Sequence, residues 1–397
     1  MVMAVMSIIQ LIFCVTDRRG KDMSYNMNIE NLDKNFATKI TVNEPDIVWF
    51  NIREAPFMLY GILYDEKLKR FLRMPDEVAQ TISEGVKELN RHTSGGRVRF
   101  KTDSAYIAIR AVMDPSRGMS HMPRTGQSGF DLYRNCDGKE MYFSTFVPPQ
   151  NWEDGYSGET KTFGGLTEYT INFPLYDNVR ELFVGLKKDA ILQKAAEYKY
   201  PNPIVFYGNS ITQGGCASRP GNSYQGFISR RLSTDFINLG FSGNGKGEKE
   251  MANYIAGIPM SILVMDYDSN APSADALQAT HYPFYKVVRE ANPDLPIVLI
   301  THPSALHEVF FKTHTDYDRW GSFERRWGII RATYDRARLE GDQNIYFVDG
   351  REIFKGEEWD AVTVDGVHPN DFGFLRFAIC LEKILCSILE GKYVKDI

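Results

Sequence analysis

The sequence has little cysteine, and its few cysteines form no recognisable pattern. Among 397 residues there are five, an odd number, and they are widely spaced. They are Cys14, Cys136, Cys216, Cys380 and Cys386. This is neither a disulfide framework nor the paired Cys-x-x-Cys spacing of a zinc site. We therefore expect most of these residues to be buried thiols.

Long hydrophobic runs are also missing. The most apolar stretch, Val2–Val15, is shorter than the roughly 20 residues that a helix needs to cross a bilayer, so we expect no stable membrane insertion. Its charged neighbours Asp17, Arg18 and Arg19 follow the apolar core, whereas a standard signal peptide has its charges in front. Two explanations stay open: a secretory segment, or an early start with Met23 as the true first residue. The location is accordingly secreted or periplasmic in the first case and cytoplasmic in the second.

The chain also has only a small excess of charge of one sign. The 46 Lys and Arg residues face 51 Asp and Glu residues, for a net charge of -5, and the basic residues are scattered. Such a chain has no field that would gather phosphate groups, which excludes nucleic acid as a partner. Hydrophobic content of 43% and charged content of 24% are those of an ordinary globular protein. The length predicts two domains in sequence and leaves the oligomeric state open.

The first half of the chain has the pattern of an all-β domain. The run Arg97–Arg110 alternates apolar with polar or small residues, as a half-buried antiparallel strand does. Similar short runs, separated by turn residues, are Gly129–Arg134, Glu140–Val147, Glu168–Phe173 and Glu181–Leu186. One helix is expected over Asp76–Asn90. We predict a β-sandwich or jelly roll over residues 25–197, after an apolar segment at 1–24.

After Pro201 strand-like runs alternate with helical stretches, which is typical of βαβ units and a parallel sheet. The predicted strands are Ile204–Tyr207, Phe236–Leu239, Ser261–Asp266, Pro296–Thr301 and Ile345–Val348. The predicted helices are Tyr224–Leu232, Glu248–Ile255, Ser273–Ala291, Phe323–Leu339 and a last one after Pro369. We predict a five-stranded, doubly wound α/β domain over residues 198–397, with the linker around Lys194–Pro203.

Ligands of open α/β sheets bind outside the carboxyl ends of the strands, so the segments that follow the strands are the ones to examine. After the first strand, Tyr207–Gly215 places Ser210 among glycines, which let a backbone approach substrate closely. After the second strand, the glycine-rich loop Asn238–Gly245 has N–H groups that can face a developing oxyanion, and Gly243 is the donor we expect. This loop lacks the Gly-Lys-Ser/Thr of a phosphate-binding P-loop.

The C-terminal region adds a base. Asp365 precedes His368 by three residues, within reach of the ring nitrogen that does not face the serine.

Other histidines and aromatic residues are weaker candidates. His302, His307 and His314, with Asp316 and Asp318, match no zinc motif, and we interpret them as loop residues near the substrate cleft. Of the many aromatic residues in the first half, Trp152 and Tyr156 are the candidates for stacking on a sugar.

Three of these segments together resemble a known family. Gly208-Asn-Ser-Ile-Thr212, Asn238–Gly243 and Asp365-x-x-His368 resemble three of the four ordered sequence blocks of the SGNH (GDSL-like) hydrolases. The resemblance covers Pro201 to the C-terminus and implies a flavodoxin-like hydrolase fold. The longer phrase Gly208–Gly221 resembles a subgroup that carries a β-sandwich before the hydrolase domain and is linked with hydrolysis of acyl or acetyl esters.

The resemblance also implies roles for single residues. Ser210 would be the nucleophile and, through its own N–H, one donor of the oxyanion hole. Gly243 would be the second donor, and His368, oriented by Asp365, the base. No metal and no cofactor are implied. The resemblance therefore implies a serine esterase that acts on esters of small acyl groups, with acetyl as the first candidate, carried by a small molecule or a carbohydrate. Two alternatives remain: a carbohydrate-binding protein with a degraded hydrolase domain, and an acyltransferase.

The sequence departs from the family pattern at two places. The usual Gly-Asp-Ser is Gly-Asn-Ser here, which removes a charge at Asn209 but keeps the hydroxyl of Ser210. After the third strand the family has Gly-x-Asn-Asp, whose Asn donates to the oxyanion, whereas this chain has Asp266-Tyr-Asp-Ser-Asn270. Either Asn270 reaches the site from further along, or Asp268 occupies this place and cannot donate while it is ionised.

Overall fold

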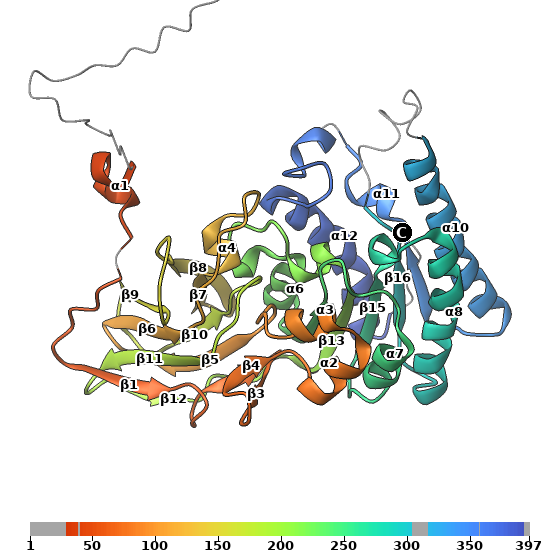
Figure 1. The fold of residues 1–397 in the computed structure, drawn as a ribbon. Helices are drawn as coiled ribbons and strands as arrows, with labels where there is room; N and C mark the ends of the chain where they lie inside the picture. The colour runs from red at the N-terminus through yellow and green to blue at the C-terminus, as the bar shows by residue number, and fades with distance from the viewer. Residues whose placement is uncertain (1–28, 39, 304–316, 357, 393–397) are drawn as a thin grey trace, which may run out of the picture. The chain divides into compact units, whose positions relative to one another are not determined.

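The computed structural model describes residues 29–38, 40–303, 317–356 and 358–392. The chain divides into two compact units, residues 1–38 and 39–397. In the first unit the described residues form a short helix, α1 (Ile29–Leu32), and a 3-10 turn, η1 (Lys34–Phe36). The predicted apolar segment 1–24 lies outside the described residues. Every element discussed below belongs to the second unit (Figure 1).

Two antiparallel sheets form the β-rich part of the second unit, as far as the structure describes it. The first has the order β1 (Ile47–Asn51), β11 (Glu181–Lys187), β6 (Tyr106–Val112), β9 (Tyr156–Lys161). The second has the order β12 (Leu192–Gln193), β5 (Arg97–Thr102), β10 (Thr167–Asn172), β7 (Phe130–Cys136), β8 (Lys139–Phe146), with β2 (Met58–Tyr60) also on β5. A small hairpin joins β3 (Leu63–Asp65) to β4 (Arg70–Leu72). The two large sheets share one apolar core, which confirms the predicted sandwich.

The predicted single strand Arg97–Arg110 is wrong, because this run is two strands in different sheets. The chain turns at Ser104, whose hydroxyl donates to the carbonyl of Tyr106 over 2.6 Å. Core residues stand at even positions before the turn, as in Val98, and at odd positions after it, as in Ile107. Both strands face the same core and are largely buried, so each alternates by itself, but the phase of the alternation shifts by one residue at the turn, which a single strand would not do.

The single helix predicted over Asp76–Asn90 is also wrong. The structure has two short helices, α2 (Asp76–Ile82) and α3 (Glu84–Leu89). Ser83 between them is extended, and its hydroxyl accepts a hydrogen bond from the N–H of Val86 over 3.1 Å. A serine that caps a new helix competes with continuation of the old one, which explains the break.

The α/β part contains five parallel strands within the described ranges, as predicted. Their order is β14 (Thr234–Gly240), β13 (Tyr200–Gly208), β15 (Ile262–Asp266), β16 (Ile297–Ile300), β17 (Ile345–Val348). This is the flavodoxin-like order 2-1-3-4-5, in which the first strand lies between the second and the third. The strand β13 begins at Tyr200, inside the predicted linker. The carboxyl ends of β13, β14 and β15 therefore meet at one edge.

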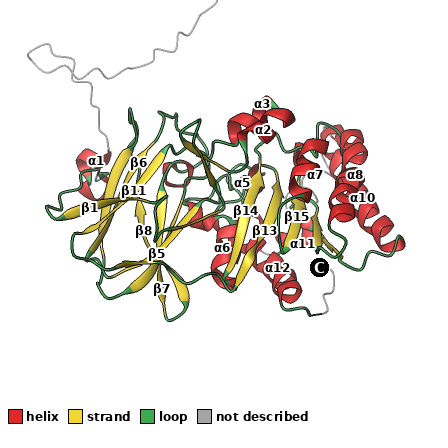
Figure 2. Ribbon diagram, turned by 90° about the horizontal axis from the view of Figure 1, so that it is seen from below, coloured by secondary structure: helices red, strands yellow, loops and turns green. Residues whose placement is uncertain are grey.

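Helices cover both faces of this sheet (Figure 2). One face packs against α6 (Tyr224–Leu232) and α12 (Asp371–Leu389). The other packs against α7 (Lys249–Ala256), α8 (Ala274–Ala291) and α10 (Tyr317–Leu339). Neighbouring strand residues serve opposite faces: Phe206 lies in the first of these cores and Tyr207 in the second. None of the helices in the described ranges has both the length and the apolarity of a membrane span.

A buried ion pair connects the sandwich to the α/β sheet. Arg97 of β5 forms a salt bridge with Asp235 of β14, and the side chains are 2% and 13% exposed. The same guanidinium donates to the carbonyl of Phe236 over 3.1 Å and lies 3.8 Å from the centre of its ring. Burial raises the pKa of Asp235, and the nearby charge of Arg97 opposes that shift. The outer face of β5 is thereby fixed to the start of β14.

We expect Arg97→Met to lower the free energy of unfolding by about 3–5 kcal/mol, because the carboxylate of Asp235 stays buried without its partner. The matched control is Lys194→Met, which removes an exposed pair with Glu197 (59% and 65% exposed) and should barely change stability. Urea unfolding followed by tryptophan fluorescence measures both. Equal midpoints for the two variants would contradict the stabilising role of the buried pair.

Candidate active site

Ser210 lies at the carboxyl end of the central strand β13. The strand ends at Gly208, and Ser210 is the first residue of a four-residue helix, α5 (Ser210–Gln213). Asn209 caps this helix: its side-chain oxygen accepts from the N–H of Ile211 over 2.7 Å and of Thr212 over 3.3 Å. The helix ends in Gly214 with a positive φ of 105°, a conformation that favours glycine. This tight turn presents the serine at the edge of the sheet.

The structure brings Ser210, His368 and Asp365 into one hydrogen-bonded chain. Ser210 Oγ lies 2.8 Å from His368 Nε2, and His368 Nδ1 lies 2.7 Å from Asp365 Oδ2. The second carboxylate oxygen accepts from the N–H of His368 over 2.8 Å and of Val367 over 3.0 Å. Burial would raise the pKa of Asp365, but the hydrogen bonds from His368 and Val367 hold it below its usual value. Asp365 is therefore an ionised acceptor that fixes the ring.

The histidine segment is tied to the loop that follows the serine. Asp371, the first residue of α12, accepts hydrogen bonds from the N–H of Ser218 over 2.8 Å and from Asn222 Nδ2 over 2.7 Å, and also from the Ser218 hydroxyl. Within the segment, the N–H of Val364 donates to the carbonyl of His368 over 2.9 Å. Two segments about 150 residues apart in sequence thus hold the base beside the serine.

Gly243 and Asn270, which follow the two strands on either side of β13, contact each other. Gly243 has a φ of 68°, and its N–H donates to Asn270 Oδ1 over 3.2 Å. Asn270 ends a 3-10 turn, η3 (Asp268–Asn270), and its Nδ2 donates to the carbonyl of Phe241 over 2.9 Å. An amide group carries two N–H donors, and the second has no partner in the part of the chain that the structure describes. Asn270 therefore does reach the glycine loop from further along.

Asp268 has different partners. It is buried, and its carboxylate accepts from the N–H of His302 over 2.9 Å and from the hydroxyl of Ser269 over 3.2 Å. Burial raises its pKa, against the effect of these hydrogen bonds. The carboxylate is thus engaged with the chain that follows β16, whereas Asn270 contacts the loop of Gly243.

The neutral side chain of Asn209 lies against a buried acid, Asp266. Asp266, at the end of β15, has no exposed surface, and burial raises its pKa well above the usual value. It accepts from Thr212 Oγ1 over 3.0 Å and from Asn209 Nδ2 over 3.3 Å. An aspartate at position 209 would set a second carboxyl group against Asp266, whereas asparagine caps α5 and also donates to that acid.

Residues of the β-rich half support the serine turn, although no motif in the sequence singles them out. Tyr176 donates its hydroxyl to the carbonyl of Ser210 over 3.1 Å, and Ser94 donates to the carbonyl of Gln213 over 2.6 Å. The side chain of Gln213 lies 3.1 Å from His92 Nδ1 and accepts from the N–H of Ser242 over 3.0 Å. The two residues of each hydrogen bond are 29 to 121 positions apart in the sequence, so no local sequence pattern indicates these contacts.

Arg73 holds the glycine loop in the same way. Its side chain is buried, donates to the carbonyls of Gly240 and of Leu89, the latter over 2.5 Å, and lies 4.3 Å from the centre of the Phe241 ring. No carboxylate pairs with it in the described ranges. Burial lowers its pKa to about 9. The guanidinium is stabilised by carbonyl oxygens, and it fixes the backbone just before Gly243.

The remaining candidates from the sequence have mixed outcomes. His302 is buried, and its Nδ1 lies 2.7 Å from the hydroxyl of Ser269; burial, Arg326 and His368 lower its pKa to about 4. His307, His314 and Asp316, and the side chain of Asp318, lie outside the described residues.

Of the two sugar-stacking candidates, Tyr156 is a core residue whose hydroxyl donates to the carbonyl of Ser128 over 3.0 Å, so that prediction is wrong. Trp152 donates to the carbonyl of Asp114 over 3.0 Å, and the guanidinium of Arg124 covers its ring at 4.5 Å.

Comparison with known proteins gives matches over both halves of the chain. Residues 201–386 match the GDSL-like lipase/acylhydrolase family, and residues 47–192 match the N-terminus of SGNH-hydrolase-type esterases. A candidate GDSL-like lipase from Bacteroides ovatus is 29% identical, with a TM-score of 0.75, over 87% of this chain and 98% of that one. No curated protein matches this sequence significantly.

Two more distant structures share the fold. A salicylyl-acyltransferase of a tetracycline biosynthetic pathway is 19% identical, with a TM-score of 0.69, over 88% of this chain and 99% of its own. An active-site mutant of a family two carbohydrate esterase from Clostridium thermocellum is 12% identical, with a TM-score of 0.55, over 88% and 100%.

We expect Asn209→Asp to destabilise the protein, because its carboxyl group would be buried against Asp266 and the donor to that acid is lost. The cost should be about 1–3 kcal/mol. A buried acid has a raised pKa in the folded state, so the loss should be small in acid and grow as the pH rises above the unfolded value of about 3.9. Thermal unfolding from pH 4 to pH 8 measures it, with Asn209→Asp/Asp266→Asn as the rescuing control. A loss that is independent of pH, or no rescue, would refute this account.

Proposed function

Since the chain belongs to the GDSL-like (SGNH-type) ester hydrolases, we propose that it cleaves its ester through an acyl intermediate on Ser210. The observation that carries the proposal is the 2.8 Å contact between Ser210 Oγ and His368 Nε2. Asp365 accepts from Nδ1 of the same ring, so the proton belongs on Nδ1 and the lone pair of Nε2 faces the serine. This is the arrangement of an activated nucleophile.

The reaction follows from these positions. Ser210 Oγ attacks the ester carbonyl while its proton passes to His368 Nε2, and a tetrahedral oxyanion forms. His368 then returns the proton to the leaving alcohol as the carbon–oxygen bond breaks, which leaves the acyl group on Ser210. Water attacks that acyl ester with His368 again as base, and the acid is released. Asp365 stabilises the imidazolium that exists in both steps.

Three N–H donors are candidates for the oxyanion. The N–H of Ser210 has no partner within the described ranges, because Asn209 caps the next two N–H groups instead. Gly243 N–H and Asn270 Nδ2 supply the others. In the free protein Gly243 donates to Asn270 Oδ1, so the oxyanion takes over this hydrogen bond when substrate binds. Its contact with the loop of Gly243 supports Asn270, rather than Asp268, as our candidate for the third donor.

We place the substrate among esters of small acyl groups, with acetyl on a carbohydrate as the first candidate. The support is the architecture, since the fold is shared with a family two carbohydrate esterase over most of both chains. The sandwich before the hydrolase part is where a sugar leaving group would be oriented. Transfer of the acyl group to an alcohol uses the same intermediate, and the shared fold of an acyltransferase makes it the second candidate.

Hydrolysis of p-nitrophenyl acetate, butyrate and octanoate tests the nucleophile and the acyl preference together. We expect acetate to be turned over with the highest kcat/KM. Ser210→Ala and His368→Ala should each lower kcat by on the order of 10⁴-fold or more while the circular dichroism spectrum stays unchanged. Product analysis with added cellobiose distinguishes free acetate from acetylated sugar. An inert native chain that still binds oligosaccharide would establish the binding protein instead.

The third donor has its own test. Asn270→Ala should lower kcat for p-nitrophenyl acetate by about 10²–10³-fold with a smaller change in KM, because the lost hydrogen bond is strongest in the transition state. Asp268→Asn is the matched control: it retains the shape of a buried side chain that bonds His302, and it should change kcat by only a few fold. The opposite ranking of the two variants would place position 268 in the oxyanion hole.

A further inference from the structure

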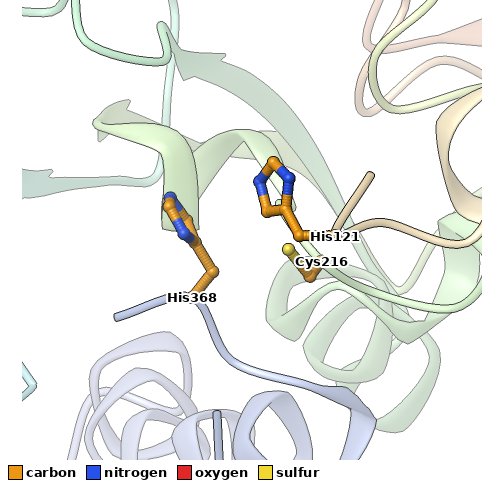
Figure 3. Close-up of side chains that lie close together, drawn as sticks. All are labelled: His121, Cys216 and His368. Carbon is orange, nitrogen blue, oxygen red and sulfur yellow. The ribbon is translucent and has the colours of Figure 1, made fainter. Parts of the chain in front are cut away.

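Three side chains that bind soft metals face one another beside the serine. Among the described residues, His121, Cys216 and His368 each offer a ligand atom within 4.8 Å of the other two. Figure 3 shows the Cys216 sulfur next to His121, with the His368 ring on the opposite side of the group. The ring centroids of the histidines are 5.7 Å apart. Of the three, only His368 has a part in the proposed reaction.

The segment that carries His121 is held in place, although its side chain is exposed. Gln127, in the short helix α4 (Arg124–Gln127), accepts from the N–H of Met119 over 2.9 Å and donates to the carbonyl of Arg117 over 2.7 Å. Thr125 of the same helix donates to the carbonyl of Ser218 over 2.6 Å, two residues beyond Cys216. These hydrogen bonds between side chains and backbone hold the segment of His121, which belongs to the sandwich half, next to the loop of Cys216.

An ion can reach this group from solvent. A cavity of about 360 Å³ is lined by His121 and Cys216, together with Val364 and Phe372. The thiol of Cys216 is otherwise buried, with 2% of the residue exposed. The cavity therefore opens the thiol and the His121 ring to solvent, and the His368 side chain is itself 22% exposed.

The donor set selects the metal. Two imidazoles and a thiolate suit Zn²⁺, whereas Mg²⁺ and Ca²⁺ prefer oxygen ligands. Ligand atoms about 2.0–2.3 Å from a tetrahedral zinc lie roughly 3.3–3.7 Å apart, so rotation of the exposed His121 side chain has only a short gap to close. Burial, together with the charge of Asp365, raises the pKa of Cys216 to about 12. Metal binding therefore releases this proton to solvent.

We propose that His121, Cys216 and His368 form an inhibitory Zn²⁺ site that takes the base away from Ser210. Asp365 holds His368 Nδ1, so Nε2 is the ring atom left for the metal, and a carboxylate behind a metal-bound histidine is a common support. Zn²⁺ accepts lone pairs from His368 Nε2, one nitrogen of His121 and the Cys216 thiolate, and water fills the fourth position. One proton leaves Cys216 for solvent. Ser210 keeps its proton and loses its acceptor.

The inhibitory consequence rests on the proposed esterase function, whereas metal binding does not. Activity on p-nitrophenyl acetate is measured against free ZnCl₂, with MgCl₂ as the hard-cation control. We expect zinc to inhibit the native enzyme and magnesium to have no effect. Cys216→Ser and His121→Ala should keep the basal rate and need a Zn²⁺ concentration about 10–100-fold higher, or more, for half inhibition. Cys380→Ser, a partly buried thiol in α12, should behave like the native chain. Equal sensitivity in all variants would overturn the site.

Cobalt supplies a readout that needs no activity. Co²⁺ added to Ser210→Ala should produce the charge-transfer absorption of a thiolate–cobalt bond, and Cys216→Ser in the same background should abolish it. If the native chain cleaves no ester, the proposed function fails and the cobalt spectrum alone decides the metal site. Absence of the thiolate band in Ser210→Ala refutes the site, whatever the activity.

Discussion

The turn after β13 must expose one hydroxyl while the backbone around it is buried, and each buried polar group needs a partner. The α/β half alone does not supply all of these partners. Tyr176 and Ser94 donate hydrogen bonds to backbone carbonyls of α5, and Arg73 donates to carbonyls around the glycine loop. Loss of the Ser94 hydroxyl would remove the donor to the Gln213 carbonyl in a low-dielectric interior, at a cost of about 1–3 kcal/mol, whereas the Ser210 carbonyl would keep the N–H groups of Gly214 and Gly215. The position of Ser210 thus depends on hydrogen bonds from the sandwich.

This dependence gives the sandwich a structural task at the site, whatever its part in binding substrate. Arg97 fixes its sheet to β14, and Thr125 brings the segment of His121 to the loop after the serine. Both contacts are made by side chains whose partners lie on the other half of the second unit. The two halves accordingly belong to one compact unit, and the matches to known families extend over both of them.

The parts of this account that are local in sequence could be predicted from it. The five parallel strands are short apolar runs between helical stretches, and their flavodoxin-like order is what the resemblance to the SGNH hydrolases implies. Asp365 and His368 are three residues apart, so their contact needs no tertiary information. Ser210 was singled out by its place after the first strand, where the carboxyl ends of parallel strands form the ligand edge, together with the glycine loop and the Asp365-x-x-His368 segment that follow in the family's order.

Features that depend on contacts distant in sequence could not be predicted. Arg73 and Tyr176 look like ordinary residues of the β-rich half, because their partners lie 167 and 34 positions away. His121 and Cys216 are nearly a hundred residues apart, and only the fold makes them neighbours. The predictions of one strand across Ser104 and of one helix across Ser83 were wrong for another reason. At each place a serine hydroxyl forms a local hydrogen bond where the chain changes direction, and apolar residues on both sides still pack into one core.

The central claim is that Ser210 is a nucleophile because His368 accepts its proton. A fluorophosphonate probe, followed by peptide mass spectrometry, tests this most directly, since the adduct marks the attacking atom without any assumption about substrate. The account predicts one adduct, on Ser210, which forms in the native chain and is lost in His368→Ala. An adduct on another residue, no adduct on the folded native chain, or undiminished labelling of Ser210 in His368→Ala would contradict it.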